Sequence, residues 1–510
     1  MKLNFYTKSK LNQIKTDTYI LVMTEEFVKK SKCNKKCECP LCKARKNDDF
    51  KGKSGEMSLI PFENKMTLLC GIGKEKKLTE LVAQNFGGTL FSYLNSHKIK
   101  QAFLMIDSDI DDKGTIKYKT KIGNNDIYEL CANVAFGMRL KSYSFNKYYT
   151  GERVKSHTLK VKEVNLLCKK SNVAEERFRE LELIAENVFF TRDLISEPAN
   201  ELNPDSYADI CRKLIPLGIE VEVLGEKQME KLGMGSLLAV GLGSDRESKL
   251  VTLKWNGAKN KKSTPISFVG KGITFDSGGL SLKPPSGMEE MKTDMGGSAV
   301  VVGLIRLLAM RKAKVNAVGV VALVENMVSG KAQKPGDVVK SMSGQTIEVL
   351  NTDAEGRLIL ADAIYYTVTK FKPKMVIDLA TLTGAIMVAL ADKKAGMFSN
   401  NESLVRELEN SAKKTGEAVW RMPLSELGGE YDKMIDSQIA DMKNIGGRYG
   451  GSTTAAQLLQ RFTNKHKKWC HLDIAGVAWK GKGDSLAKKG ATGYGIRLLN
   501  KLVKDYYEEK

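Results

Sequence analysis

The sequence has little proline and histidine and no long apolar run, and each shortage excludes a class of protein. Eleven prolines among 510 residues, without a glycine repeat, exclude a collagen-like or proline-rich chain. No stretch of about 18 consecutive apolar residues occurs, so we expect no membrane span. Residues 1–13 are polar and lack the apolar centre of a secretory signal, which predicts a cytoplasmic protein.

Histidine is scarce, which limits the kinds of metal site that the chain can build. None of the histidines has the H-E-x-x-H spacing that places two ligands on one face of a helix, so a zincin-type metalloprotease is excluded. A metal site in this chain would have to use mainly oxygen ligands, which suit Mn²⁺, Mg²⁺ or Zn²⁺. The four histidines are His97, His157, His466 and His471.

The composition is that of a folded protein with a basic surface. The chain is 42% hydrophobic and 28% charged, and its length suits two domains. The net charge is +21, but only 16 of the 81 basic residues are arginine. Phosphate recognition favours arginine, and the lysines are spread along the chain with only short clusters near residues 74–77, 259–262 and 465–468. We therefore interpret the charge as a lysine-rich surface, with nucleic-acid binding as the less favoured alternative.

The nine cysteines form two groups. Five are isolated, mostly in apolar runs, and are predicted to be reduced core residues: Cys70, Cys131, Cys168, Cys211 and Cys470. The other four follow a C-x3-C-x-C-x2-C spacing that differs from the separated pairs of a zinc finger: Cys33, Cys37, Cys39 and Cys42. Neighbouring lysines would favour their thiolates. An exposed loop without metal is the favoured interpretation, and a metal-binding or redox cluster is the alternative.

Alternating apolar runs and amphipathic segments predict an α/β fold with two domains. In the first, smaller domain, residues 1–172, strands are expected at 18–23, 66–73, 101–107 and 159–168, and helices at 78–94 and 125–140. The Cys-rich insert near 33–42 lies in this domain. A long amphipathic helix at 173–195 is expected to connect it to the second domain.

The second domain, residues 196–510, has the pattern of a largely parallel or mixed sheet flanked by helices. Nearly continuous apolar runs at 315–323 and 375–380 suit strands that are buried on both faces. Helices are expected at 296–312 and 357–370. In such sheets, ligand sites form at the carboxyl ends of the strands.

Several of these strand ends are charged. A Gly-rich loop at 271–283 follows the apolar run ISFVG, the segment MKTDMGG precedes a helix, and NTDAEGRL follows TIEVL. Together they contribute four acidic residues: Asp276, Asp294, Asp353 and Glu355. Unpaired carboxylates in one cleft would repel each other, and two divalent cations would neutralise them.

Three basic residues accompany the carboxylates. A neutral Lys271 or Lys283 could ligate a metal, whereas a charged Lys or Arg357 could stabilise an oxyanion or hold an anionic cofactor. The alternative is structural, because Asp294 and Asp353 each precede a helix and could cap it. The segment GVAWKGKG resembles a phosphate-binding loop, but Gly483 stands where the motif needs Ser or Thr, so ATP binding is discarded.

At this point the sequence resembles a known family. NTDAEGRL is similar to the signature of the leucyl aminopeptidase family, the two-metal cytosol aminopeptidases. Further segments resemble family blocks in family order: VGKGITFDSGGLSLKP, MKTDMGG, DLATLTGA, NIGGRYGGSTTAA and HLDIAGVAW. The resemblance is close over about residues 185–500 and much weaker in the N-terminal domain.

The resemblance implies roles for named residues. One metal would be held by Lys271, Asp276, Asp294 and Glu355, and the other by Asp276, Asp353 and Glu355. The catalytic pair would be Lys283, which polarises the scissile carbonyl, and Arg357, which holds a bicarbonate as general base. The substrate side chain would lie near Met291, Thr381, Leu382, Gly384 and either Ala475 or Ala478.

The resemblance also implies an activity and an assembly. The chain would be a metal-dependent aminopeptidase that releases N-terminal residues, Leu or Met by preference, from peptides, with two Mn²⁺ or Zn²⁺ ions per subunit. It would form a homohexamer whose active sites face an inner cavity that admits short peptides. The Cys-rich segment is the one part that does not resemble a family feature.

Overall fold

The chain folds into two compact units. The computed structural model describes residues 1–8, 15–16, 18–31, 39–62, 65–106, 109–110, 116–117, 119 and 121–509. The first unit comprises Met1–Ala185 and Lys482–Lys488, and the second comprises Glu186–Gly481 and Lys489–Lys510. The division falls inside helix α6 (Ser171–Ser196), which covers the segment expected to be the connector.

The first unit includes a short C-terminal segment that the sequence analysis assigned to the second domain. Lys141 donates a hydrogen bond to the carbonyl of Ala487 over 2.8 Å, and the Ser485 hydroxyl donates to Asn85 Oδ1 over 2.7 Å. These bonds tie residues 482–488 to the helices of the first unit, which a partition by sequence position alone does not reveal.

The first unit is built on a mixed sheet of six strands. Its order is β1-β10-β5-β2-β4-β3, parallel throughout except for the last pair. The strands are β1 (Lys2–Tyr6), β10 (Glu163–Leu167), β5 (Gln101–Ile106), β2 (Thr18–Thr24), β4 (Lys65–Gly73) and β3 (Met57–Phe62). The apolar runs expected as strands form the central strands, because a strand covered on both faces needs apolar residues at every position.

Helices and short hairpins complete the first unit. Helix α3 begins after Thr79, whose hydroxyl accepts a hydrogen bond from the Val82 N–H. The helices are α1 (Glu25–Lys30), α2 (Pro40–Asp48), α3 (Glu80–Ser96), α4 (Ile127–Ser142), α5 (Glu152–His157) and the 3₁₀ helix η2 (Glu75–Lys77). The hairpin strands are β6 (Asp109–Ile110), β7 (Ile116–Lys117), β8 (Lys121–Ile122) and β9 (Asn125–Asp126).

The cysteine predictions divide between described and undescribed residues. The five isolated cysteines are all buried, which confirms that they are core residues. In the Cys-rich segment, Cys33 and Cys37 lie outside the described residues, whereas Cys39 is half-buried and Cys42 is buried in α2. The favoured interpretation of an exposed loop is therefore wrong for Cys42, because this side chain packs inside the unit from a helix, while a metal-binding or redox role of the four thiols stays a prediction.

The second unit contains a mixed sheet of eight strands in the order β11-β12-β14-β13-β17-β21-β18-β19. The neighbours β14, β13, β17 and β21 are mutually parallel, and antiparallel pairs flank them. In sheet order the strands are β11 (Glu220–Leu224), β12 (Lys249–Asn256), β14 (Asn316–Asn326), β13 (Ile266–Asp276), β17 (Val376–Ala380), β21 (Trp469–Asp473), β18 (Ala395–Ser399) and β19 (Val419–Arg421). The expected mixed sheet is confirmed.

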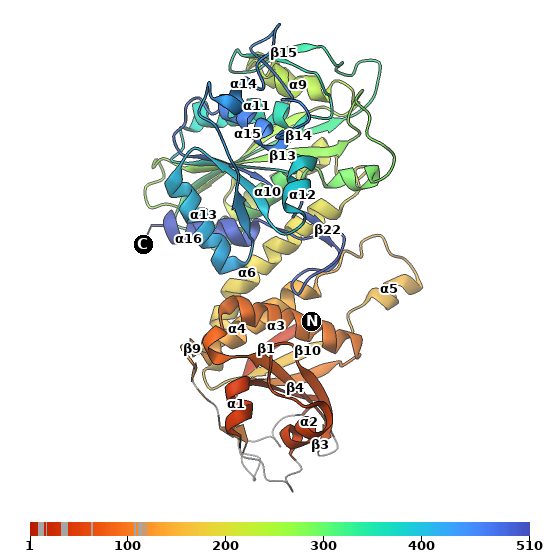
Figure 1. Ribbon diagram of the computed structural model, residues 1–510, viewed down its shortest axis with the longest axis vertical. Coiled ribbons are helices and arrows are strands. Elements are labelled where there is room, and N and C mark those ends of the chain that lie inside the picture. The colour runs from red at the N-terminus through yellow and green to blue at the C-terminus, as the bar shows by residue number, and fades with distance from the viewer. Residues whose placement is uncertain are drawn as a thin grey trace. The chain divides into compact units, whose positions relative to one another are not determined.

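Helices cover both faces of this sheet. In Figure 1, α9, α11 and α15 lie on one side of β13 and β14, and α10 and α16 lie on the other. The helices are α7 (Pro204–Arg212), α8 (Glu226–Lys231), α9 (Gly235–Gly241), α10 (Gly296–Met310), α11 (Gly356–Phe371), α12 (Gly384–Leu390), α13 (Glu402–Thr415), α14 (Glu430–Lys433), α15 (Gly451–Arg461) and α16 (Ile496–Tyr506). Two 3₁₀ helices, η3 (Ile215–Leu217) and η4 (Met288–Thr293), are also present.

Helix α10 packs unusually close to the sheet because glycine lies at two contact points. A Cβ at Gly270 would lie 2.5 Å from Ser298 Cα, and a Cβ at Gly297 would lie 2.0 Å from the carbonyl oxygen of Leu379. Both distances are shorter than any allowed contact. The segment Met288–Met310 is long and apolar enough to cross a membrane, but 83% of its most apolar window is buried inside the fold.

Two segments near the charged strand ends differ from the sequence prediction. Residues 271–276 continue strand β13 and the loop begins at Ser277, because Gly270 and Gly272 let the strand pass close to Ser298 of α10. The run TIEVL lies outside the central sheet. It contributes β16 (Thr346–Glu348) to a three-stranded sheet with β15 (Val338–Lys340) and β20 (Met442–Lys443). A separate hairpin pairs β22 (Trp479–Lys480) with β23 (Gly490–Ala491).

Candidate active site

The four predicted carboxylates and both predicted lysines meet at the carboxyl ends of the central strands. Strand β13 carries Lys271 and ends at Asp276, and Asp294 ends η4. Glu355 precedes α11 directly, and Asp353 lies two residues before Glu355. Carboxylate oxygens of Asp276, Asp353 and Glu355 all lie within 4.8 Å of one another. The sequence therefore predicted correctly that these charges converge.

Lys271 lies at the buried side of this cluster. Its ammonium nitrogen is 2.8 Å from Asp294 Oδ2 and 2.8 Å from Glu355 Oε1, and it donates a hydrogen bond to the carbonyl of Thr381 over 2.9 Å. The side chain is only 3% exposed, so a charged lysine is tolerated there only because carboxylates surround it. A Cβ at Gly356 would lie 2.7 Å from Lys271 Nζ, so glycine is needed where α11 begins.

Lys283 lies on the more open side of the cluster. Its ammonium is 2.9 Å from Asp276 Oδ2 and also pairs with Asp353. The other oxygen of Asp276 accepts hydrogen bonds from the Gly278 N–H over 2.9 Å and from Asn326 Nδ2 over 2.8 Å. Asn326, at the end of β14, escaped the sequence analysis, although its place directly after a buried apolar strand was a usable signal.

The charges in the cluster are unbalanced. Burial raises the pKa of Asp294 and of Glu355, and neighbouring carboxylates raise both further, although Lys271 opposes this. Burial lowers the pKa of Lys271, but Asp294, Glu355 and Asp276 raise it more, so the net shift is upward. Four carboxylates face two ammonium groups, and the buried oxygen Glu355 Oε2 has no hydrogen-bond partner among the described residues. These residues therefore fit additional cationic charge.

Arg357 is buried in the first turn of α11. Its Nη1 donates a hydrogen bond to the carbonyl of Asn444 over 2.7 Å, and its Nε has no partner in the described part of the chain. Burial lowers the pKa of Arg357 to about 10, against the opposing influence of Glu355 and Asp473. The guanidinium remains charged at neutral pH, and its unused donor could bind an anion.

The predicted substrate-pocket residues divide into two groups. Thr381 is part of the cluster, since its hydroxyl donates to Asp294 Oδ1 over 2.7 Å. Ala478 lies beside it, because a Cβ at Gly296 would lie 3.4 Å from both Ala478 Cβ and Thr381 Cγ2. Gly384 begins α12 and is exposed, and a Cβ there would meet no atom within 4 Å.

The remaining pocket residues flank the cluster. Met291 is half-buried in η4, and its carbonyl accepts the Asp294 N–H over 3.2 Å. Leu382 is half-buried, and its N–H donates to Asp473 Oδ1 over 3.1 Å. The buried Asp473, at the end of β21, also accepts the Thr383 hydroxyl over 2.7 Å and thereby shapes the 381–383 segment. Sequence reasoning missed Asp473, although HLDIAG showed an acid at a strand end.

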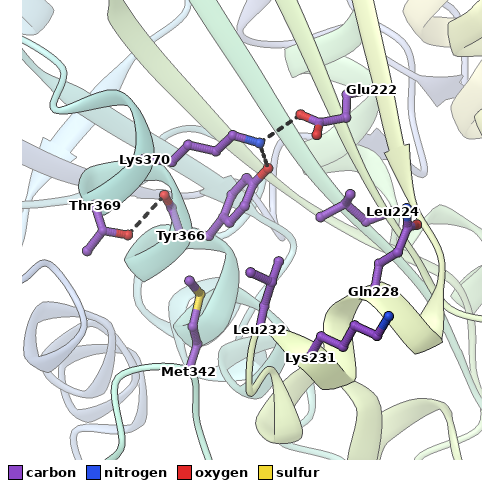
Figure 2. Close-up of a pocket in the computed structure, with 9 residues that line it drawn as sticks. All are labelled: Glu222, Leu224, Gln228, Lys231, Leu232, Met342, Tyr366, Thr369 and Lys370. Carbon is purple, nitrogen blue, oxygen red and sulfur yellow. Dashed lines mark hydrogen bonds and ion pairs between the residues drawn. The ribbon is translucent and has the colours of Figure 1, made fainter.

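A separate pocket opens elsewhere in the second unit. Figure 2 shows it between β11, α8 and the later turns of α11, with a volume of about 520 Å³. Its walls include Leu224, Leu232 and Met342, and Lys370 at its edge donates hydrogen bonds to Glu222 and Tyr366. None of the sequence-predicted site residues is among the described residues that line this pocket, so the pocket gives no information about the predicted site.

Comparison with known proteins matches both parts of the chain to one family. Residues 189–500 match the catalytic domain of the cytosol aminopeptidase family, and residues 23–152 match its N-terminal domain. A probable cytosol aminopeptidase of Wolbachia pipientis wMel is 51% identical over 468 residues, 90% of this chain and 88% of that protein. One from Caulobacter vibrioides is 53% identical over 400 residues, 78% of this chain and 80% of that protein.

Solved structures agree with the sequence matches. A tomato leucine aminopeptidase mutant superposes with a TM-score of 0.83 and 30% identity, over 99% of this chain and 96% of that one. The bottromycin maturation enzyme BotP in complex with Mn superposes with a TM-score of 0.80 and 27% identity, over 96% and 99%. The N-terminal match extends the resemblance beyond the region where the motifs were close. Sequence blocks, both domains and the fold thus agree, and the chain belongs to the cytosol aminopeptidase family.

Proposed function

We propose that this protein is a metal-dependent aminopeptidase that hydrolyses N-terminal residues, Leu or Met by preference, from peptides. The observation that carries the proposal is the buried cluster in which four carboxylates face only two ammonium groups and Glu355 Oε2 has no hydrogen-bond partner among the described residues. Family membership supplies the reaction, and the cluster supplies a place for it.

Two divalent ions, Mn²⁺ or Zn²⁺, fit the donor set of the cluster. Lys271, Asp276, Asp294 and Glu355 would hold one ion, and Asp276, Asp353 and Glu355 would hold the other. The second set is supported by the 4.8 Å spread of its three carboxylates. Bound ions would polarise the scissile carbonyl and lower the pKa of a water molecule. Lys271 and Lys283 form ion pairs with the same carboxylates, so Lys271 would ligate an ion only after its ammonium gives up a proton.

Two basic side chains would act on the reacting groups. Lys283 is one-fifth exposed, and its ammonium can turn from Asp276 and Asp353 to donate to the carbonyl oxygen as negative charge develops there. Arg357 would hold a bicarbonate through its free Nε, and that anion would accept the proton of the attacking water. Both roles rest on N–H donors that already lie beside the carboxylate cluster before a substrate binds.

The segments around the cluster would select the N-terminal side chain of the substrate. Met291, Thr381, Leu382 and Gly384 present mainly apolar atoms, and Gly384 faces open space. A pocket of this kind favours Leu or Met over smaller residues. Each missing methylene costs about 1–3 kcal/mol, so the preference among apolar residues would be graded rather than absolute.

Removal of metal provides the test. Protein dialysed against a chelator is expected to lose hydrolysis of a leucine or methionine chromogenic amide, and added Mn²⁺ or Zn²⁺ should restore it. Asp353→Asn should abolish this recovery. The matched control is Asp362→Asn, because Asp362 is an acid of the same unit outside the cluster and accepts hydrogen bonds from the Leu237 and Met342 amides, over 2.8 Å and 2.7 Å. Full activity in protein shown to contain no metal would refute the proposal.

The family resemblance also supports an assembly and a location. We propose a homohexamer in the cytoplasm, with peptides as the substrates that reach its active sites. Light scattering on the purified protein tests the assembly directly, because a monomer and a hexamer differ sixfold in mass. A monomer that retains full peptidase activity would refute the hexamer as a functional requirement.

A further inference from the structure

Asn444 lies next to the turn that carries Asp353 and is bonded to the backbone of that turn and to Arg357. It follows β20, is fully buried, and its N–H donates to the carbonyl of Glu348 over 2.9 Å. This bond continues the pairing between β20 and β16 and fixes the backbone of Asn444 relative to the segment that leads to Asp353 and Glu355.

The carboxamide of Asn444 uses both of its ends on one turn, residues 350–354. Its Oδ1 accepts the N–H groups of Leu350 and Asn351, over 2.9 Å and 3.3 Å. Its Nδ2 donates to the carbonyl oxygens of Asn351 and Ala354, over 2.6 Å and 3.4 Å. Because two acceptor and two donor positions are all used, the side chain fixes both the position and the tilt of the turn.

The main chain of Asn444 holds a second group. Its carbonyl oxygen accepts a hydrogen bond from Arg357 Nη1 over 2.7 Å. Within the described part of the chain, this bond is the one that holds the Arg357 guanidinium in place. Asn444 therefore bonds both to the turn that carries Asp353 and to the guanidinium of Arg357.

The opposite side of the turn is held by a different loop. Thr352 Oγ1 donates to the carbonyl of Gly278 over 2.7 Å and accepts the Ser281 N–H over 2.8 Å. These bonds fix the turn at Thr352 alone, about which it could still tilt if its other contacts were lost. The Asn444 side chain supplies four further bonds, three to residues before Thr352 and one to Ala354 after it.

We propose that Asn444 is a positioning residue that aligns the metal-facing carboxylates Asp353 and Glu355 with the guanidinium of Arg357. This inference rests on the proposed function, since it assigns Asn444 a role toward the same ions. Its consequence is a coupling: a change at position 444 disturbs ion binding and turnover together, although the side chain of Asn444 itself touches neither ion nor substrate.

Only asparagine satisfies this arrangement. Aspartate keeps the shape of the side chain but would turn a carboxylate oxygen toward the carbonyls of Asn351 and Ala354, where repulsion replaces attraction. Alanine would remove all four of these bonds and would leave the Asn351 carbonyl with only the Ala354 N–H, over 3.2 Å. Both Asn444→Asp and Asn444→Ala should therefore release the turn, and the aspartate variant covers the case in which the alanine variant does not fold.

Asn316 offers a matched control in the eight-stranded sheet of the same unit. It is a buried asparagine at the start of β14, whose Nδ2 donates to the carbonyls of Asn260 and Ser263, both over 3.0 Å, and whose Oδ1 accepts the Ala258 N–H over 3.1 Å. It holds a loop at the end of the strand opposite the cluster. Asn316→Ala removes a comparable set of bonds without touching the proposed site.

The experiment uses the full chain, stripped of metal and titrated with Mn²⁺ in a calorimeter, followed by kcat and KM at saturating Mn²⁺. We expect both Asn444 variants to bind Mn²⁺ about 10- to 100-fold more weakly. Their kcat should stay low at saturating Mn²⁺ because Arg357 remains displaced, while KM changes less. Asn316→Ala should lower the melting temperature but keep Mn²⁺ affinity and kcat.

The outcomes separate this inference from the proposed function. Folded Asn444 variants with wild-type Mn²⁺ affinity and wild-type kcat would overturn the positioning role and leave the proposed function intact. Equal losses in Asn316→Ala and the Asn444 variants would also overturn it, because the effect would then be one of general stability. Wild-type protein that binds neither Mn²⁺ nor Zn²⁺ would overturn both proposals at once.

Discussion

The two ends of the central strands in the second unit bury polar groups in different ways. At the amino end, Asn316 is neutral and its carboxamide bonds to three backbone segments. At the carboxyl end, Lys271 and its neighbours are charged, and two buried atoms, Glu355 Oε2 and Arg357 Nε, have no partners among the described residues. The same β-strands thus carry a fully bonded neutral carboxamide, Asn316, at one end and an incompletely bonded charged cluster at the other.

This difference separates structural from functional polarity. A buried polar group normally finds a partner, because an unmade hydrogen bond costs about 1–3 kcal/mol. At the amino end, Asn316 obeys this rule with groups of the chain itself. The carboxyl end breaks it in several places at once, as expected where a bound ion or anion completes the network. In this fold, buried charged groups that lack hydrogen-bond partners are therefore a better guide to function than buried polar groups that have them.

The largest expected effect comes from Lys283 at the charged end. Lys283→Ala should lower kcat about 100- to 1,000-fold, because it removes a donor to the developing oxyanion. Its ammonium also competes with cations for Asp276 and Asp353 in the metal-free protein. Mn²⁺ affinity, measured by calorimetry, should therefore stay equal or become tighter.

The comparison of the two strand ends becomes sharper when kcat and Mn²⁺ affinity of Lys283→Ala are measured separately. Circular dichroism of Lys283→Ala should match the wild-type spectrum, since the side chain lies at the open side of the cluster. An unchanged kcat would count against the catalytic role of Lys283. A loss of Mn²⁺ affinity in parallel with kcat would instead place Lys283 among the groups that hold the ion site together.

A moderate effect is expected at the neutral end. Trp255 Nε1 donates to the carbonyl of Ala313 over 2.9 Å, close to the start of β14. Trp255→Phe keeps most of the ring but loses this bond, and should lower the free energy of unfolding by about 1 kcal/mol in urea denaturation. Both kcat and Mn²⁺ affinity should be unchanged. A change in either would break the distinction between the two ends.

The smallest effect is expected between the two ends, at His471 on β21. Its Nδ1 lies 2.6 Å from Asp378 Oδ1. Burial lowers the pKa of His471, but Asp378 raises it more, so the net shift is upward. The stability that the charged pair contributes is present below the unfolded pKa of about 6.5 and is lost as the pH rises through the folded value.

His471→Gln should remove this pH dependence. Gln cannot titrate, so the free energy of unfolding of the variant, measured in urea from about pH 6 to about pH 9, should fall less with rising pH than that of the wild type. Activity at one pH serves as the control and should change little. Parallel pH profiles for the two proteins would show that His471 does not change charge on unfolding.

Element types followed from the sequence where the local pattern was strong. The runs at 18–23, 66–73, 315–323 and 375–380 form β2, β4, β14 and β17, because uninterrupted apolar residues suit strands covered on both faces. The helices expected at 296–312 and 357–370 are α10 and α11. The acidic residues of the cluster were predictable for a similar reason, since Asp276 ends β13 and the other three lie within three residues of the start of α10 or α11.

The misplaced and missed features all depend on distant parts of the chain. TIEVL has the composition of a strand, but its partners β15 and β20 place it in a separate small sheet. Asn444 and Asp473 are ordinary polar residues in sequence, and their importance comes from partners that approach them only after folding. Arg357, for example, is 87 positions from Asn444.

By itself, the sequence determined which segments become strands and helices, which residue types meet at the charged strand ends, and the family to which the motifs belong. Only the tertiary structure decided which carboxylate each ammonium faces, which buried atoms lack partners, and which side chain holds the Asp353 turn. The physical reason is the distance along the chain between the residues that interact. Burial patterns and caps are encoded among neighbouring residues, whereas ion pairs and hydrogen-bond saturation depend on the register of strands and loops far apart in the chain.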